Sequence, residues 1–293
     1  MNQRLNVTAP LRWLITGAAG MLGSDLRQLL TDQGEQLVAL DRSELDITDS
    51  TAVNACINDH SPSIIVNCAA YTAVDRAEEE EGLATAINGS AVEHLAAAAN
   101  AVNALLVQVS TDFVFDGSSE RPYEVTDATA PVSAYGRSKL VGEINAATAR
   151  KHLIVRTSWL FGENGPSFVA AIRNQIAKGT NPLRVVSDQR GRPTYTPHLA
   201  AALIRLGRLE DARGIFHYAD EGECSWYDLA QAIVEESGAS VDVVPVTTGE
   251  FPRPARRPAY SVLSTERYER VTGVAPASWR EGLGELLELR IEN

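Results

Sequence analysis

Cysteine, lysine and long apolar runs are all scarce in this chain of 293 residues. The three cysteines, Cys56, Cys68 and Cys224, do not stand at CxxC or metal-ligand spacing, so we expect reduced thiols and no structural zinc. No apolar stretch approaches the ~20 residues that cross a bilayer. Residues 1–10 lack the apolar core of a signal peptide, so we expect a cytoplasmic protein with a loose extension before its first strand.

Positive charge is also in short supply. The 26 lysines and arginines face 38 aspartates and glutamates, which leaves a net charge of -12. This charge disfavours nucleic acid and anionic membranes as partners, and an anionic small molecule would need locally arranged donors. The five histidines stand at no metal-like spacing. A run of four acids at residues 78–81 is expected to be a solvated helix face.

Short apolar runs alternate with helical patterns in the first half of the chain. Strands are expected at residues 11–16, 36–40, 63–68, 104–110 and 153–157. Leu22, Leu26 and Leu30 form the apolar stripe of a helix packed on a sheet, and helices are also expected at 91–103 and 138–149. This alternation predicts an α/β fold, a Rossmann-like doubly wound parallel sheet.

The glycine-rich segment TGAAGMLG lies between an expected strand and an expected helix, the context in which such spacing predicts dinucleotide binding. Gly17 permits a tight turn, Gly20 lets the backbone approach a pyrophosphate, and Gly23 lets the helix pack closely on the strand. Met21 and Leu22, which begin the helix, complete the candidate cofactor loop. The alternative is that these glycines only turn the chain.

Charged residues at the end of the second strand address the choice of cofactor. Asp41 stands where a carboxylate can bind both ribose hydroxyls of NAD. Arg42 follows, and an arginine there can pair with the 2′-phosphate of NADP, so NADH and NADPH both stay open. Asp46 and Ile47 could flank the adenine, or Asp46 could cap a helix.

The motif YGRSK places Tyr135 and Lys139 one helical turn apart on the same face. Reducing a ketone requires a hydride from a nicotinamide and a proton at the oxygen. Tyr135 would deliver the proton, and the Lys139 cation would lower the pKa of the phenol and could hold the nicotinamide ribose. Thr111, at the end of the fourth strand, would polarise the carbonyl. An exposed surface pair is the alternative reading of the motif.

The glycine loop and the YGRSK motif are joined by six further segments, VNCAAYTAVDRAE, VSTDFVFDG, VRTSWLFG, DQRGRPT, WYDLA and FPRPARRPAYSVL. With all of these motifs, nearly the whole chain resembles the dTDP-4-dehydrorhamnose reductases of the extended short-chain dehydrogenase/reductase family. The resemblance implies that the 4-keto group of dTDP-4-dehydro-β-L-rhamnose is reduced to give dTDP-L-rhamnose, with NADPH or NADH as cofactor. It also implies that Thr111, Tyr135 and Lys139 are the catalytic residues.

Further site residues follow from the same resemblance. The cofactor-lining residues that it implies are Ala69, Ala70 and Tyr71, beside Tyr135 and Lys139. The substrate contacts that it implies are Thr72, Val74, Asp112, Phe113 and Trp159, beside Thr111 and Tyr135. Phe113 stands where the family more often has tyrosine, so any hydroxyl contact from this position is lost. Some relatives form magnesium-bridged dimers; Asp25 matches one acidic position, and further metal ligands are unknown.

Beyond Trp159 the pattern loosens into glycine- and proline-marked loops with scattered helices. We expect residues 1–158 to form the NAD(P)-binding domain, with a return of about 195–220 to it, and residues 159–293 to form mainly a smaller α+β substrate domain. Helices are expected at residues 168–178, 197–206, 226–236 and 280–288, and a returning strand at 215–218. In the proline-rich loop, Arg253, Arg256 and Arg257 are candidates to bind the diphosphate or the thymine side, or are only surface arginines.

Two other functions stay open. An epimerase or a different 4-ketosugar reductase would share the fold and the motifs. An epimerase would keep its dinucleotide through purification, whereas a reductase must exchange it. A non-catalytic NADP-binding subunit, like the regulatory subunit of methionine adenosyltransferase, would stimulate a partner synthetase and would not need the catalytic residues.

Overall fold

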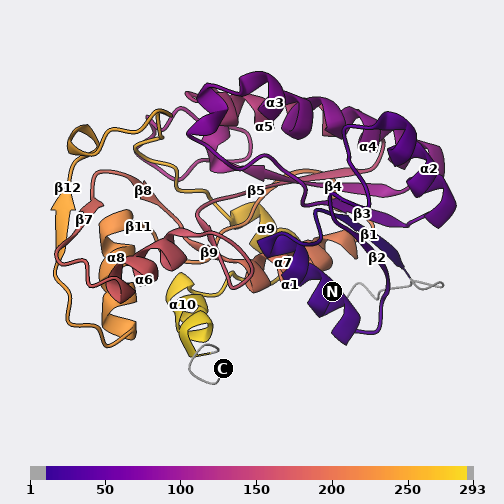
Figure 1. The fold of residues 1–293 in the computed structure, drawn as a ribbon. Coiled ribbons are helices and arrows are strands. Elements are labelled where there is room, and N and C mark those ends of the chain that lie inside the picture. Colours follow the sequence, from indigo (N-terminus) through magenta and orange to yellow (C-terminus); the bar gives the residue numbers. More distant parts are fainter. Residues whose placement is uncertain (1–10, 289–293) are drawn as a thin grey trace.

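The computed structural model describes residues 11–288, where the expected strands form a six-stranded parallel sheet of order β10-β5-β4-β3-β1-β2 (Figure 1). Its strands are β1 (Arg12–Thr16), β2 (Gln36–Leu40), β3 (Ile64–Asn67), β4 (Leu105–Thr111), β5 (His152–Thr157) and β10 (Gly214–His217). The order reverses at β1, and open α/β sheets bind ligands at the carboxyl edge beside such a switch point. The Rossmann-like doubly wound fold is confirmed, whereas the extension expected at residues 1–10 lies outside the described residues.

Helices cover both faces of the sheet (Figure 1). One face carries α1 (Met21–Asp32) and α7 (Thr196–Gly207), and the other carries α2 (Ser50–His60), α4 (Ala91–Val102) and α5 (Ala134–Ala146). The leucine stripe of α1 explains its place, because Leu22, Leu26 and Leu30 are all buried against the sheet. The alanines of α4 bring that helix close to the opposite face.

Helix α5 begins four residues before the start that its sequence pattern predicts. The hydroxyl of Ser133 accepts a hydrogen bond from the backbone N–H of Gly136 at 3.1 Å and so caps the helix. A second acceptor is provided by Glu78, whose carboxylate receives the N–H of Ala134. This early start places Tyr135 in the first helical turn.

The C-terminal part contains short strands and helices around a second core. Its strands are β6 (Leu160–Phe161), β7 (Leu183–Val186), β8 (Arg190–Gly191), β9 (Thr194–Tyr195), β11 (Cys224–Ser225) and β12 (Val243–Val246). They pair as β7 with β12 and β6 with β9 in parallel, and as β8 with β11 in antiparallel. Helices α6 (Phe168–Ala177), α8 (Trp226–Glu236) and α10 (Trp279–Glu288) enclose this core with the apolar side chains of Ile172, Leu229 and Leu283.

Two later segments join the main sheet layer. The strand expected at 215–218 is present as β10, one residue earlier, and pairs in parallel with β5. Helix α9 (Glu266–Thr272) buries Tyr268 in the core beneath α7. The shorter helical turns are η1 (Arg76–Glu78), α3 (Glu81–Thr85), η2 (Ala86–Ser90), η3 (Asp112–Val114) and η4 (Thr248–Glu250).

The acidic run 78–81 is not the uniform solvated helix face that we expected. Glu78 ends η1 and Glu81 begins α3, and these two residues make specific bonds to α5. Glu78 binds the N–H of Ala134, and Glu81 forms a salt bridge to Arg137 at 2.7 Å. The run therefore fastens this segment to the helix that carries Tyr135.

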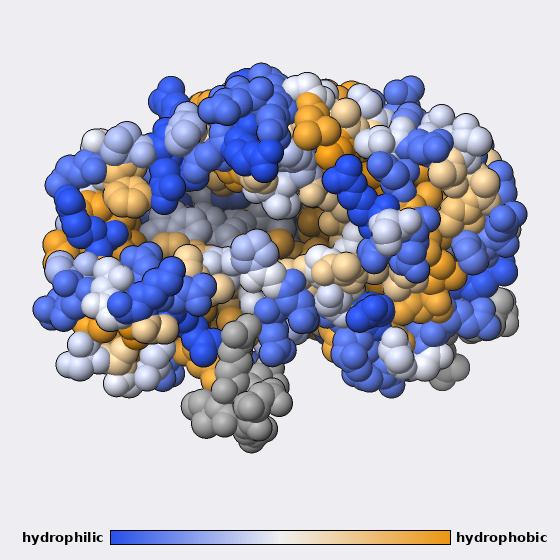
Figure 2. All heavy atoms as spheres, viewed as in Figure 1, coloured by the Kyte–Doolittle hydropathy of each residue, from blue (hydrophilic) through white to orange (hydrophobic). Residues whose placement is uncertain are grey.

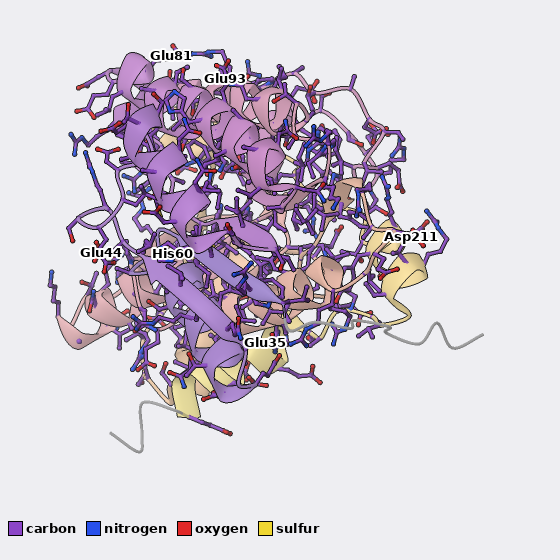
Figure 3. The ribbon with its side chains drawn as sticks, turned by 90° about the vertical axis from the view of Figure 1, so that its right-hand side faces the viewer. Glu35, Glu44, His60, Glu81, Glu93 and Asp211 are labelled. Carbon is purple, nitrogen blue, oxygen red and sulfur yellow. The ribbon has the colours of Figure 1, made fainter. Side chains whose placement is uncertain are left out.

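Acidic side chains are spread over the surface. Figure 3 labels five of them on one side of the molecule, Glu35, Glu44, Glu81, Glu93 and Asp211, which come from well-separated parts of the sequence.

Within residues 11–288, no helix combines the length and the apolar character needed to cross a membrane.

Candidate functional site

The glycine loop joins β1 to α1 at the carboxyl edge of the sheet. Gly17 has φ +68°, and a Cβ there would stand 2.6 Å from the backbone nitrogen of Ala69, so only glycine fits. A Cβ on Gly23 would strike the carbonyl oxygen of Gly17, which explains the close approach of helix to loop. Gly20 is the N-cap residue of α1 and makes no side-chain cap, so the N–H groups of the first turn point to an anion site.

The end of β2 lies beside this loop, since the N–H of Ala18 binds the carbonyl of Leu40 at 3.0 Å. Asp41 accepts hydrogen bonds from the hydroxyl and the N–H of Ser43, both at 2.7 Å, and these bonds lower the pKa of its carboxyl group. Asp41 is therefore an ionised acceptor at the position where a ribose is expected, and the exposed Arg42 follows it.

Asp46 is not a helix cap. It accepts the N–H and the hydroxyl of Thr48 in a local turn, whereas Asp49 caps α2. Asp46 is exposed, but the side chain of Ile47 is buried in the core under α2 and α4. Of this predicted pair only Asp46 is exposed, because Ile47 is 4% exposed and its carbonyl oxygen lies 3.2 Å from Nδ1 of His94.

The residues after β3 are held in place by two asparagines. Asn67 accepts the hydroxyl of Thr16 at 2.6 Å, and so joins the ends of β1 and β3. Asn88 binds both backbone groups of Tyr71, at 2.8 and 3.0 Å, and donates to the hydroxyl of Ser138 on α5. Ala69, Ala70 and Tyr71 therefore lie between the glycine loop and α5. The sequence analysis missed both asparagines, because their partners are distant in sequence.

Thr111, Tyr135 and Lys139 gather where β4 ends against α5. Thr111 is the last residue of β4 and is 6% exposed. Its hydroxyl lies close to that of Tyr135, which is in the first turn of α5. Lys139 is 4% exposed, and its ammonium group donates to the carbonyl oxygen of Val109 at 2.7 Å. The three predicted catalytic residues thus occupy one place at the carboxyl edge of the sheet.

The expectation that Lys139 lowers the pKa of Tyr135 is wrong for this structure. Burial raises the pKa of Tyr135 to about 12, and the nearby charge of Asp112 acts in the same direction. Burial also lowers the pKa of Lys139 to about 8, against the opposing charge of Glu143. The ammonium group of Lys139 is bound to a backbone carbonyl instead of the phenol. Because its pKa is about 12, Tyr135 is a protonated phenol at neutral pH.

Asp112 is a buried carboxyl group directly after Thr111. It is 2% exposed, its Oδ1 accepts the hydroxyl of Thr111 at 3.0 Å, and its Oδ2 lacks a well-aligned donor. Burial raises the pKa of Asp112 to about 6. A carboxylate oxygen without a donor, close to Tyr135, is suited to accept a hydroxyl group of a ligand.

Aromatic rings form the adjoining wall. Phe113 meets the ring of Tyr135 edge to face, with centroids 5.5 Å apart. Trp159 stacks on Trp226 at 3.5 Å and has φ +49°, an unusual value for a residue other than glycine. A Cβ at Gly191 would collide with the indole of Trp159. Trp226, which the sequence analysis named only as part of a helix, is thus the support for the predicted substrate contact Trp159.

A cavity of about 800 Å³ continues from this wall between α6, β7, α8 and the loop 248–259 (Figure 2). Arg253, Arg256 and Arg257 all line it. Arg253 and Arg256 are exposed, and Arg253 lies over the ring of Phe251. Arg257 differs, because its guanidinium binds Asp75 at 3.0 Å and fastens the loop. Arg253 and Arg256 are therefore the arginines available to an anionic ligand.

The segment 72–74 is connected to the arginine loop through the residue that follows it, Asp75. Thr72 is exposed and Val74 is half-buried, just before Asp75, which holds the loop through Arg257. The N–H of Ala255 also binds Asp75, at 3.2 Å. The two predicted substrate contacts are thereby tied to the arginine loop by contacts between residues 180 positions apart.

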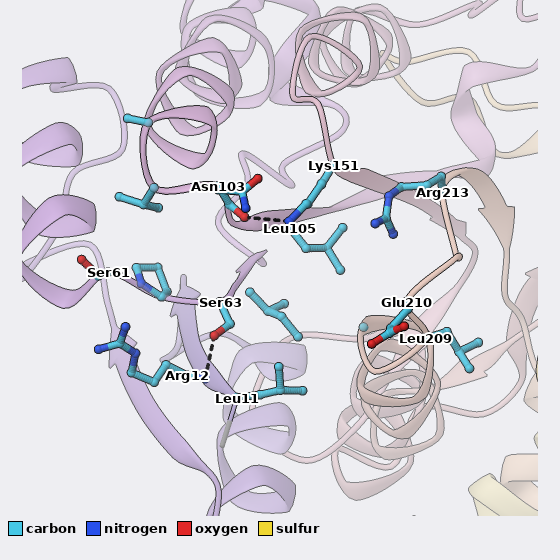
Figure 4. A pocket seen from close by; sticks show the side chains of 15 residues that line it. Leu11, Arg12, Ser61, Ser63, Asn103, Leu105, Lys151, Leu209, Glu210 and Arg213 are labelled. Carbon is cyan, nitrogen blue, oxygen red and sulfur yellow. Dashed lines mark hydrogen bonds between the residues drawn. The ribbon is translucent and has the colours of Figure 1, made fainter. Parts of the chain in front are cut away.

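A second cavity, of about 790 Å³, lies at the amino-terminal edge of the sheet (Figure 4). It is lined by Arg12, Ser63, Lys151 and Arg213, which stand at or just before the starts of their strands. Lys151 donates to the carbonyl of Asn103 at 3.2 Å. None of the predicted site residues reaches this edge, so it is separate from the site built by Thr111, Tyr135 and Lys139.

Asp25, the position matched to a magnesium ligand, is bonded within the protein. Its Oδ2 accepts the hydroxyl of Thr196, and burial raises its pKa. In the described part of the chain, no three histidine, cysteine, aspartate or glutamate side chains are grouped to hold a metal ion.

Comparisons with known proteins show the family to which this chain belongs. A family model of the RmlD substrate binding domain matches residues 11–291. A Streptomyces antibioticus protein, named as a probable dTDP-4,6-dihydroxy-2-methyloxan-3-one 4-ketoreductase, is 46% identical over 94% of each chain. The dTDP-4-dehydrorhamnose reductase of Streptomyces griseus is 44% identical over 94% of this chain and 92% of its own. The Bacillus anthracis dTDP-4-dehydrorhamnose reductase, solved in complex with NADP, superposes with a TM-score of 0.92 at 37% identity, covering 97% of this chain and 100% of that one. The chain therefore belongs to the RmlD substrate binding domain family, as its motifs indicated.

Proposed function

We propose that this chain reduces the 4-keto group of dTDP-4-dehydro-β-L-rhamnose to the hydroxyl of dTDP-L-rhamnose, with NADPH or NADH as cofactor. One observation carries the proposal. Thr111, Tyr135 and Lys139 lie together at the carboxyl end of β4, with Lys139 buried and bonded to Val109 and with the hydroxyl of Thr111 close to that of Tyr135. The names of the relatives from Streptomyces griseus and Bacillus anthracis support the reaction and the nicotinamide cofactor.

The loop after β1 fits a dinucleotide. The space kept free at Gly17 and Gly23 and the uncapped start of α1 suit a pyrophosphate. Asp41 suits a ribose, and Arg42 would meet a 2′-phosphate if NADPH is the cofactor. When bound, the cofactor supplies the hydride that is added to the carbonyl carbon.

The residues of the chain handle the carbonyl oxygen. Tyr135 is protonated at neutral pH, so it can donate its proton as negative charge develops on that oxygen. Thr111 donates a second hydrogen bond to the same oxygen, and Lys139 stabilises the phenolate that remains. The phenolate then recovers a proton from solvent, so the reaction consumes one hydride and one proton for each ketone reduced.

The nucleotide half of the substrate would lie in the cavity of about 800 Å³. Arg253 and Arg256 expose guanidinium groups there, which a diphosphate can bind with charge-assisted hydrogen bonds. Such local charge is needed because the net charge of -12 opposes an anionic substrate.

A second candidate is the reduction of another dTDP-linked 4-ketosugar. The relative from Streptomyces antibioticus carries the name of a different 4-ketoreductase. Phe113, at the edge of the Tyr135 ring, has no hydroxyl to offer a sugar. A ketosugar that does not need a hydrogen bond at this position would suit such a site.

A coupled assay distinguishes the two candidates. The loss of NADPH or NADH absorbance is followed while dTDP-glucose is converted in situ by a 4,6-dehydratase, with or without the 3,5-epimerase. Oxidation that requires the epimerase supports the rhamnose precursor. Oxidation without the epimerase favours the unepimerised 4-ketosugar, and no oxidation in either case contradicts the rhamnose precursor and this unepimerised sugar alike.

A further inference from the structure

A buried ion pair lies beneath α5, one helical turn beyond Lys139. The guanidinium of Arg156 on β5 binds the carboxylate of Glu143 through two bonds, at 2.7 and 2.9 Å. The two side chains are only 3% and 5% exposed. Burying two charges is costly, and the bidentate geometry offsets that cost only while both partners are present.

Further contacts connect this pair to the rest of the sheet. Ser110 on β4 donates its hydroxyl to Glu143 at 2.6 Å. Arg156 lies over the ring of Phe115 at 5.0 Å and lies 3.4 Å from Nε2 of His217 on β10. Burial lowers the pKa of His217 to about 3, so this imidazole is neutral. Glu143 thus attaches α5 directly to β4 and β5, and Arg156 extends the contact to β10.

Glu143 and Lys139 attach α5 to neighbouring residues of β4. Lys139 binds the carbonyl of Val109, and Glu143 binds the next residue, Ser110. Tyr135, Lys139 and Glu143 follow one another at intervals of four residues on the same face of α5. Two successive turns of the helix are therefore fixed to two successive residues of β4.

We propose that Glu143 is a positioning residue for Lys139: held by Arg156 and Ser110, its carboxylate keeps the lysine against β4 and keeps its amine charged. This inference rests on the proposed function, since Lys139 acts there as a cation beside the tyrosine. Glu143 itself does not contact the substrate; it acts through the lysine.

The charges around Lys139 agree with this role. Burial lowers its pKa to about 8, and Glu143 is the first of the groups that oppose the shift. The other is Cys68, after β3, whose own pKa burial raises to about 12, so that thiol is neutral in the working range. Tyr135, on the same helix face, is neutral as well. Glu143 is therefore the source of negative charge that favours the ammonium form, and the positive charge of Arg156, which binds it, offsets part of this effect.

Glu143→Gln tests the proposal. The chain has three lysines, so the Cε signals of ¹³C-labelled lysine can be titrated by NMR, with Lys151→Arg and Lys178→Arg for assignment. We expect the midpoint of Lys139 to fall by about one pKa unit, a tenfold loss of proton affinity. The high-pH limb of kcat/KM should move by the same amount, because the neutral lysine no longer stabilises the phenolate.

Two further variants separate charge from folding. Glu143→Gln leaves Arg156 buried and unpaired, and this cation by itself lowers the midpoint of Lys139. Glu143→Gln with Arg156→Met removes both charges and should restore a folded protein whose midpoint is still lowered, by less than in the single variant; a wild-type midpoint in this double variant would overturn the proposal. Glu81→Gln is the matched control, because it breaks a half-exposed pair to Arg137 on the same helix and should change neither midpoint nor limb.

The outcomes are distinct. A fall in kcat at every pH with an unmoved Lys139 midpoint would overturn the proposal and leave Glu143 as a structural brace only. A lowered midpoint in both Glu143 variants supports it. If the wild-type chain reduces neither ketosugar yet the midpoint still falls, the proposed function fails while the effect of Glu143 on Lys139 stands.

Discussion

Replacing Asp112 by asparagine removes a carboxyl group that the fold buries beside Tyr135. Burial raises the pKa of Asp112 from 3.8 to about 6, and the neighbouring hydroxyls of Ser261 and Thr111 oppose this shift only in part. Between these two pH values the folded state binds more protons than the unfolded state, so stability falls as pH rises. At about 1.4 kcal/mol per pKa unit, the charged carboxyl costs about 3 kcal/mol above pH 6.

The Asp112→Asn variant has the same shape without the titration. We expect its free energy of unfolding to equal that of the wild type near pH 3 and to exceed it by about 3 kcal/mol at pH 7, with most of the difference arising between pH 4 and 7. Urea unfolding, followed by tryptophan fluorescence at several pH values, measures this difference, in which the other titrating groups cancel. Activity should fall as stability rises, because Asp112 is a predicted substrate contact.

Asp116→Asn is the control of opposite sign. A hydrogen bond from Tyr123 is the main cause that lowers the pKa of Asp116 to about 2. Its contribution to stability is therefore present above pH 3.8 and is lost as pH falls toward 2, so the Asp116→Asn difference should not change between pH 4 and 7. If the difference in free energy of unfolding between Asp112→Asn and the wild type were equally constant over this pH range, the reasoning that the ionised Asp112 carboxylate destabilises the folded state would be refuted.

Three further predictions concern the cofactor and the substrate. Tyr135→Phe should bind NADPH normally and lose about 10²–10⁴-fold in kcat/KM, because it removes only the proton donor; unchanged turnover would contradict the mechanism. Gly23→Ala places a methyl group against a loop carbonyl, so it should weaken NADPH binding at least about tenfold and lower the free energy of unfolding by about 1–3 kcal/mol. Gly82→Ala is the control, because its methyl group meets open space and should change neither quantity. Calorimetry measures the binding and thermal unfolding the stability, and equal effects of the two variants would refute the steric argument. Arg256→Met should raise KM with kcat unchanged, and unaltered binding of dTDP in a titration would remove Arg256 from the substrate site.

Much of the architecture was predictable because it rests on local pattern. Alternating apolar runs and the leucine stripe of α1 predicted the strands and the first helix, and the glycine loop predicted the anion-binding turn. The pattern was silent on α2, where only Val53 and Ile57 are buried. It also misplaced the start of α5, which depends on a cap by Ser133 and on a carboxylate from a distant turn.

The sequence predicted which residues form the candidate site better than it predicted how their side chains are arranged. Tyr135 and Lys139 stand at helical spacing, so their adjacency followed from the sequence. The three arginines of the proline-rich loop look alike in sequence, yet Asp75 engages Arg257 and leaves Arg253 and Arg256 exposed. The supports Asn88 and Trp226 carried no chemical signal of their own, because each acts through a partner far along the chain.

The sequence by itself determined the parallel α/β fold, the glycine loop after the first strand and the pairing of Tyr135 with Lys139, because these depend on spacings of a few residues that backbone geometry converts directly into neighbours. Only the tertiary structure decided that Asp112 and Tyr135 carry raised pKa values and that Glu143 is held by Arg156. Those properties arise from desolvation and from contacts between strands and helices that meet only after the chain has folded.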